Sequence, residues 1–170
     1  IAKKAMPGCT VLIAKDGKLA FQKSYGSYTY KPEATKVNPY SIYDLASLTK
    51  MLSTTLAVMK LYDQGKIDLK KKISDYLPEF EGSNKANIPI EKLLLHEGGL
   101  VSYIPFYKET LAADGKPLNS IYRETASDSF PTLVAKNLYL RKDWQDTILS
   151  RIINSPVGPE KYVYSDNDFI

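Results

Sequence analysis

The chain has 170 residues, of which 44% are hydrophobic, 25% charged and 11% aromatic, and its net charge is +4. This composition is typical of a globular domain and excludes a disordered, collagen-like or coiled-coil protein. The basic excess is small, and its densest run, residues 70–72, has no interleaved aromatic residue, which argues against nucleic-acid binding. No apolar run approaches the ~18 residues of a membrane span.

The first predicted element is a β-hairpin. Residues 9–15 and 18–23 are rich in β-forming side chains, and they flank Asp16 and Gly17, a pair that tolerates the positive φ angles of a tight turn. The stretch 25–41 contains two prolines and four tyrosines, and it indicates a loop with short extended pieces.

Helices are predicted in the rest of the chain. Apolar residues recur at helical spacing over residues 47–64, followed by Gly65 as a C-cap, and the wide apolar face predicts a helix that is buried on most sides. A short helix is expected from residue 89 or 90 to 95, and another over residues 143–154. Residues 100–142 mix aromatic side chains with polar turns and give no clear pattern.

The first candidate for chemistry is the pair Ser47 and Lys50. A serine and a lysine three residues apart share one face of a helix. If burial or nearby cations lower the pKa of the lysine, its amine can accept the hydroxyl proton and make the serine a nucleophile. With 14 serines and 20 lysines, about one or two such pairs are expected by chance. The alternative is a helix N-cap at Ser47 and a surface lysine at Lys50.

Two further segments contain candidate residues. Residues 164–167 (YSDN) either project a tyrosine or serine into a cleft or form the polar start of a helix. His96, the only histidine, either bonds to the carbonyl groups at the end of its own short helix or is the histidine that a Ser-His-Asp triad requires. One histidine and one cysteine exclude a multi-histidine or thiolate zinc site.

Taken together and in this order, four segments resemble the serine β-lactamase and penicillin-binding superfamily. The branch that they resemble is that of class C β-lactamases and the related esterases and D-alanyl-peptide hydrolases. Residues 11–23 resemble its opening strands, and residues 43–50 (YDLASLTK) resemble the approach to its nucleophile. Residues 93–100 (LLLHEGGL) resemble its Leu-Leu-x-His-x-x-Gly-Leu segment, and residues 162–166 (YVYSD) resemble its Tyr-x-Asn element.

The resemblance implies a role for each matching residue. Ser47 corresponds to the acylated nucleophile, with its backbone N–H as one oxyanion donor, and Lys50 corresponds to its proton partner. Tyr164 corresponds to the residue that, as a phenolate or as a relay to Lys50, carries the proton to the leaving group and helps to activate the deacylating water. Asp166 falls at a substrate-binding position, and His96 is structural. The resemblance implies no metal or organic cofactor.

The sequence departs from the family pattern at three points. Asp166 stands where class C enzymes usually have asparagine, and a carboxylate there is expected to pair with Lys50 and raise its pKa. Residues 165–167 also spell the Ser-Asp-Asn of class A enzymes, which would make Ser165 the proton relay, although the flanking sequence favours Tyr164. The family's third element, a strand of the Lys-Thr-Gly or His-x-Gly type, is not found, so we expect this chain alone to turn over poorly.

The fold expected from this resemblance is α/β (α+β), the N-terminal part of a β-lactamase/transpeptidase-like fold in which helices flank an antiparallel sheet. Residues 1–170 then form one truncated domain, with opening strands and loop in 1–46, the nucleophile helix in 47–65 and a mostly helical region in 66–170. Since a lone hairpin is marginal in water, we expect residues beyond Ile170 to complete its sheet, with pairing to another molecule as the alternative.

The function implied is that of a serine hydrolase working through an acyl-enzyme intermediate. D-Alanyl peptides, β-lactams and small esters are the candidate substrates, and further strands or domains of the same parent chain are the expected partners. Family analogy places such a protein in the periplasm or cell envelope. The alternative is a non-catalytic binding module that keeps the penicillin-recognising fold within a larger multidomain protein.

Overall fold

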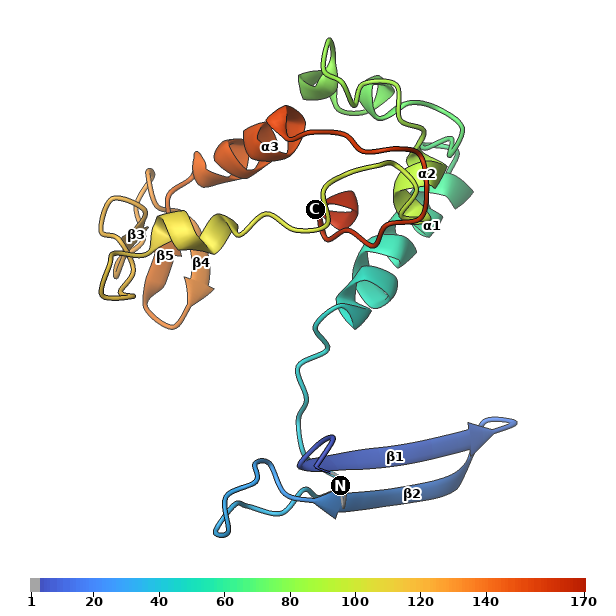
Figure 1. Cartoon of the computed structure of the whole chain (residues 1–170), viewed down its shortest axis with the longest axis vertical. Helices are drawn as coiled ribbons and strands as arrows, with labels where there is room; N and C mark the ends of the chain where they lie inside the picture. Colours follow the sequence, from blue (N-terminus) through green and yellow to red (C-terminus); the bar gives the residue numbers. More distant parts are fainter. Residues whose placement is uncertain (1–3) are drawn as a thin grey trace. The chain divides into compact units, whose positions relative to one another are not determined.

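The computed structural model describes residues 4–170, and its contacts divide the chain into two compact units. The first unit ends at Ala46, and the second runs from Ser47 to Ile170. Small antiparallel sheets and helices make up the described residues, so the predicted α+β class is confirmed (Figure 1).

The first unit is built on the predicted hairpin. β1 (Gly8–Lys15) pairs with β2 (Lys18–Gly26) in an antiparallel ladder. Asp16 and Gly17 have φ angles of 51° and 72°, the positive values that a two-residue type I′ turn requires. A β-bulge near the turn leaves Ala20 without an opposite residue in β1, because the register shifts by one position there.

The helix predicted over residues 47–64 is present in the second unit, but its first half has a different geometry. Lys50–Thr55 (η1) form a π-helix, and α1 (Leu56–Asp63) continues as an α-helix. Gly65 has a φ of 66°, and its N–H donates to the Tyr62 carbonyl at 2.9 Å, as expected for a glycine C-cap. Single π turns inside α-helices occur frequently at functional sites.

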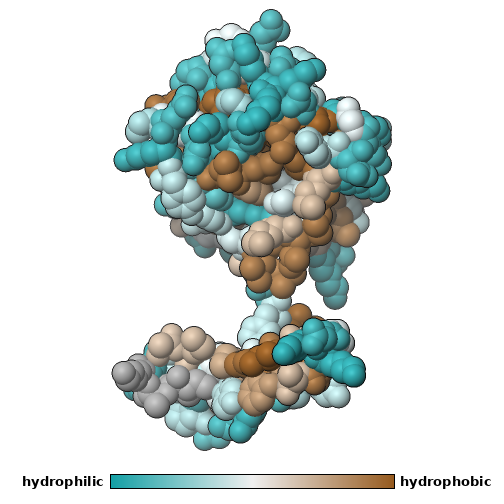
Figure 2. Space-filling model, turned by 90° about the vertical axis from the view of Figure 1, so that its right-hand side faces the viewer, coloured by the Kyte–Doolittle hydropathy of each residue, from teal (hydrophilic) through white to brown (hydrophobic). Residues whose placement is uncertain are grey.

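The prediction that this helix is buried on most sides is wrong. No residue of η1 or α1 is buried, and several large apolar side chains are exposed: Met51, Leu52, Leu56, Met59 and Tyr62. Figure 2 shows apolar side chains, in brown, gathered on the surface of this unit. A wide apolar face shows only that one side of a helix is hydrophobic. Burial also requires other elements of the protein to pack on that side. Within residues 4–170, no helix is both long and apolar enough to cross a bilayer.

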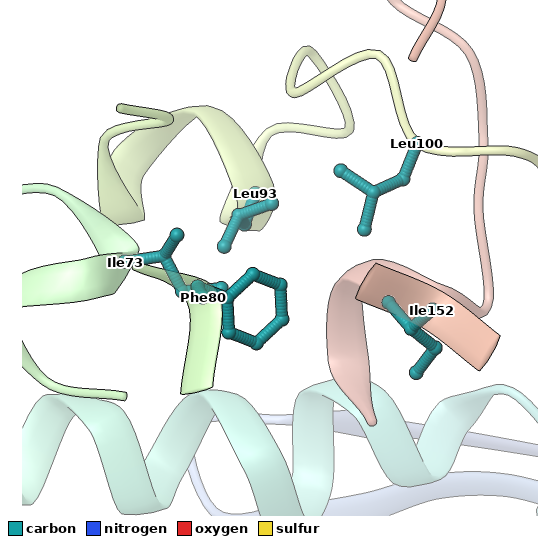
Figure 3. Packing of buried hydrophobic residues seen from close by; sticks show 5 residues of the cluster. All are labelled: Ile73, Phe80, Leu93, Leu100 and Ile152. Atoms are coloured by element: carbon teal, nitrogen blue, oxygen red, sulfur yellow. The ribbon is translucent and has the colours of Figure 1, made fainter. Parts of the chain in front are cut away.

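The core of the second unit lies elsewhere, where the predicted helices α2 (Ile90–Leu94) and α3 (Trp144–Asn154) meet two 3₁₀ turns, η2 (Ile73–Asp75) and η3 (Pro78–Phe80). Its buried cluster consists of Ile73, Phe80, Leu93, Leu100 and Ile152. In Figure 3 the ring of Phe80 lies at the centre of these side chains.

The unassigned stretch 100–142 contains a small sheet that sequence analysis missed. β3 (Tyr122–Arg123), β4 (Thr132–Ala135) and β5 (Leu138–Leu140) pair antiparallel in the order β3-β5-β4. Strands of two to four residues are too short to show a clear alternation of apolar and polar side chains. The region 66–170 is therefore less helical than predicted.

Backbone hydrogen bonds hold the C-terminal segment against the chain that follows α2. The N–H of Gly158 donates to the carbonyl of Gly99 at 2.8 Å, that of Val163 to His96 at 2.9 Å, and that of Asp166 to Ser102 at 2.9 Å. The chain then ends in a 3₁₀ turn, η5 (Asn167–Phe169), which packs against α2 (Figure 1). Two motifs that are some 65 residues apart in sequence thus become neighbours.

Removing the ring of Phe80 from this core should lower the stability of the protein by a measurable amount. Phe80 is 2% exposed, and Phe80→Ala is expected to lower the free energy of unfolding by about 3–5 kcal/mol, because the lost burial adds to the cavity left behind. Urea denaturation measures this change. Leu95→Ala, at a side chain that is 56% exposed, is the control and should cost less than about 1 kcal/mol. Equal costs for the two variants would contradict this description of the core.

Candidate active site

Ser47 opens the second unit, directly before the helix. The N–H of Lys50 donates to the Ser47 carbonyl at 3.1 Å and so closes the first helical turn. Ala46, the residue before Ser47, has a φ of 44°, a left-handed conformation that few non-glycine residues adopt. Such backbone strain is found preferentially at functional sites.

Lys50 connects two of the other candidate side chains. Its Nζ lies 3.4 Å from the Oγ of Ser47 and 2.6 Å from the Oδ1 of Asp166. The predicted contact between Lys50 and Asp166 is therefore present, with side chains that are 16% and 40% exposed. The hydrogen bond to the Asp166 carboxylate raises the pKa of Lys50, burial opposes this effect, and the Tyr164 phenol adds to it. Lys50 is thus an ammonium ion at neutral pH.

Tyr164 reaches the same serine from the C-terminal segment. Hydrogen bonding to the side chains of Ser47 and Lys50 lowers the pKa of its phenol, against the opposing effects of burial and of the Asp166 charge. The ammonium of Lys50 also lies 5.2 Å from the centre of the Tyr164 ring. Ser47 therefore lies beside both groups to which the family resemblance gives a part in proton transfer.

Ser165, the alternative proton relay, is fully buried and committed to the backbone. Its Oγ donates to the Val101 carbonyl at 2.7 Å and accepts the N–H of Asn167 at 3.1 Å. The amide of Asn167 donates to the same Val101 carbonyl at 2.6 Å. These bonds hold the turn that carries Tyr164 and Asp166.

His96 does not bond to the carbonyl groups of its own helix through its ring. Its Nδ1 lies 2.8 Å from the Oδ2 of Asp168 and 3.3 Å from the N–H of Ser165. The His96 ring packs against that of Tyr164 at a tilt of 41°, with centres 4.5 Å apart. Within the described residues Ser47 is not among its hydrogen-bond partners, so the side chains do not form a Ser-His-Asp triad.

Asp168 is the residue of this neighbourhood that sequence reasoning missed. Burial raises the pKa of its carboxyl, and the hydrogen bond to His96 acts in the opposite direction. The available signal was an acidic residue directly before two apolar ones, Phe169 and Ile170.

The arrangement as a whole suits nucleophilic chemistry at Ser47. The phenol of Tyr164, with its lowered pKa, can accept the proton of the Ser47 hydroxyl. The ammonium of Lys50, close to the same hydroxyl, stabilises negative charge there. A carbonyl carbon brought to the Oγ of Ser47 would lie next to both groups.

Comparisons with known proteins identify the family of this chain. The model of the family described as "Beta-lactamase" matches residues 1–149. An N-acetylmuramyl-L-alanine amidase of Bacillus subtilis (strain 168) is 35% identical over 114 residues, which cover 59% of this chain and 26% of the amidase. Protein flp of Staphylococcus aureus (strain COL) is 32% identical over 132 residues, which cover 75% of this chain and 26% of flp.

Solved structures show the same fold. A class C β-lactamase has a TM-score of 0.63 at 20% identity, over 98% of this chain and 37% of the enzyme. FmtA from Staphylococcus aureus has a TM-score of 0.62 at 23% identity, over 98% of this chain and 38% of FmtA. The chain spans about a quarter of the curated relatives that it matches. It has a serine hydrolase-type fold, and it belongs to the β-lactamase family.

Proposed function

We propose that the protein is a serine hydrolase that works through an acyl-enzyme intermediate. The observation that carries this proposal is the convergence of Lys50 and Tyr164 on the Oγ of Ser47. D-Alanyl peptides, β-lactams and small esters are the substrate classes. The Bacillus relative is named as an amidase of N-acetylmuramyl-L-alanine, and this favours an amide substrate from peptidoglycan, in the cell envelope.

The proposed reaction has two halves. The Tyr164 phenolate takes the proton of Ser47, whose Oγ attacks the substrate carbonyl, while the backbone N–H of Ser47 donates to the oxyanion. The leaving group departs with the proton from Tyr164, and the acyl group stays on Ser47. A water molecule then attacks the acyl carbon, gives one proton to Tyr164, and the Ser47 oxygen recovers a proton as the acid product leaves. Lys50, held as a cation by Asp166, stabilises the phenolate throughout.

A substrate panel tests the proposal. The full-length protein is incubated with a D-alanyl dipeptide, a penicillin and a short-chain ester, and product is followed against Ser47→Ala. Hydrolysis of at least one class that depends on Ser47 is the expected result. Folded protein that hydrolyses none of the three would contradict it.

The second candidate function is a non-catalytic binding module. The observation that favours it is the ion pair between Lys50 and Asp166, because a lysine held as a cation is not a proton acceptor. The substrate panel separates the two functions, since a binding module binds a penicillin or peptide without releasing product.

The same ion pair predicts a shift in pH dependence. Proton transfer needs Tyr164 deprotonated, which gives the rising limb of kcat/KM, and Lys50 protonated, which gives the falling limb. Asp166→Asn removes an anion that raises the pKa of both groups. Both limbs are therefore expected to move to lower pH. The measurement is kcat/KM against pH.

Asp114→Asn is the matched control, because that carboxylate is exposed and its partner is Lys116. Its pH profile should coincide with that of the wild type. Limbs that stay in place in Asp166→Asn would show that the carboxylate does not set the charge state of Lys50.

A further inference from the structure

His96 holds both backbone neighbours of Tyr164. Its carbonyl accepts the N–H of Val163 at 2.9 Å, and its Nδ1 lies 3.3 Å from the N–H of Ser165. The residue between them, Tyr164, presents its ring to the imidazole at a centre-to-centre distance of 4.5 Å. One histidine thus contacts the chain before, at and after the proposed proton relay.

The backbone of His96 is itself in an unfavourable conformation. Its φ is 57°, in the left-handed region, two residues before Gly98. Glycine would adopt this conformation without steric cost, whereas a residue with a Cβ pays about 1 kcal/mol or more there. A histidine at such a position implies that its ring has a task that glycine cannot perform.

Asp168 fixes the orientation of that ring. Its Oδ2 lies 2.8 Å from Nδ1, and the two side chains are 12% and 1% exposed. The other oxygen of Asp168, Oδ1, is buried without a hydrogen-bond partner among the described residues. A buried carboxyl group with one oxygen unpaired destabilises a fold, so packing alone does not account for it.

We propose that His96 and Asp168 are a positioning pair that holds the Tyr164 hydroxyl at Ser47, so that neither touches substrate and both act through the relay. This inference rests on the proposed function. If the pair is loosened, the Tyr164 hydroxyl is displaced in the transition state, so kcat should fall. Substrate binding depends on other groups, so KM should stay nearly unchanged. Misplacing a catalytic group by about 1 Å costs on the order of 100-fold in rate.

Asp168→Ala in the full-length protein tests the pair. We expect kcat to fall by about 10- to 100-fold with KM within about twofold of the wild type, the size found for residues that orient a catalytic group. Asp168→Asn places an amide N–H donor at the Nδ1 of His96, which accepts the Ser165 N–H and so carries no proton itself, and should restore kcat to within about threefold. Glu97→Ala is the matched control, because that carboxylate neighbours His96 but pairs with Lys92 at 2.7 Å.

Hydrogen exchange provides a readout that does not depend on turnover. The amide of Ser165 should exchange faster in Asp168→Ala than in the wild type and Asp168→Asn, because the imidazole is then free to rotate away from it. Unchanged kcat in Asp168→Ala would overturn the pair, and so would a joint loss in kcat, KM and melting temperature that asparagine does not rescue.

A wild-type protein without turnover on the substrate panel would be a failure of the proposed function. The pair is then decided by exchange alone. Faster exchange at Ser165 in Asp168→Ala supports it, and unchanged exchange overturns it.

Discussion

Ser47→Ala is expected to reduce kcat/KM by roughly 10⁴-fold or more, because no acyl-enzyme can form without the nucleophilic oxygen. Lys50 and Tyr164 lose their common hydrogen-bond partner in this variant but keep their contact with each other. Substrate binding should therefore persist while product formation stops. Steady-state kinetics on whichever substrate class the protein hydrolyses gives the ratio.

Ser53→Ala is the matched control for this variant. Ser53 lies on the π-helix η1 that follows Ser47 and is exposed, so the substitution removes an identical hydroxyl from the neighbouring element. Its kcat/KM should stay within about twofold of the wild type, as for most exposed substitutions. Activity that survives in Ser47→Ala would show that another residue is the nucleophile.

Tyr164→Phe is expected to lower kcat by about 10²- to 10⁴-fold, the range that general acid–base groups contribute. The substitution keeps the ring that packs on His96 and lies near Lys50, and it removes only the hydroxyl that contacts Ser47. Loss of activity would therefore be a loss of proton transfer rather than of packing. The measurement is kcat at saturating substrate.

Two further variants sharpen this prediction. Tyr162→Phe is the matched control, because the Tyr162 ring also packs edge-on with that of His96, with ring centres 6.2 Å apart, but Tyr162 is largely exposed. Ser165→Ala tests the alternative relay. A large fall in kcat for Ser165→Ala together with near wild-type kcat for Tyr164→Phe would assign the proton transfer to the serine.

Local patterns in the sequence predicted the elements that depend on local interactions. The Asp16–Gly17 turn follows from residues that tolerate positive φ, and Gly65 ends the long helix for the same reason. α2 and α3 follow from helical spacing. The three short strands have no such signal, since their pairing joins segments that are not adjacent in sequence. No local pattern predicts the π-helical geometry of η1 either.

The same division holds for the site. Resemblance to a family predicted that Ser47, Lys50, Tyr164 and Asp166 belong together, and the structure brings their side chains into contact. The carboxylate of Asp168 could not be predicted to meet His96. Their contact depends on how the C-terminal segment lies against the chain after α2, and no single-sequence pattern specifies such a long-range approach.

Intact-mass spectrometry after incubation with a fluorophosphonate and, separately, with a penicillin tests the central claim most directly. The account predicts one adduct per molecule with at least one of the two reagents, located on the peptide that contains Ser47 and lost in Ser47→Ala. The reagent that labels also begins to separate an esterase from a penicillin-recognising enzyme. A folded, full-length protein that forms no adduct with either reagent would contradict the acyl-enzyme mechanism.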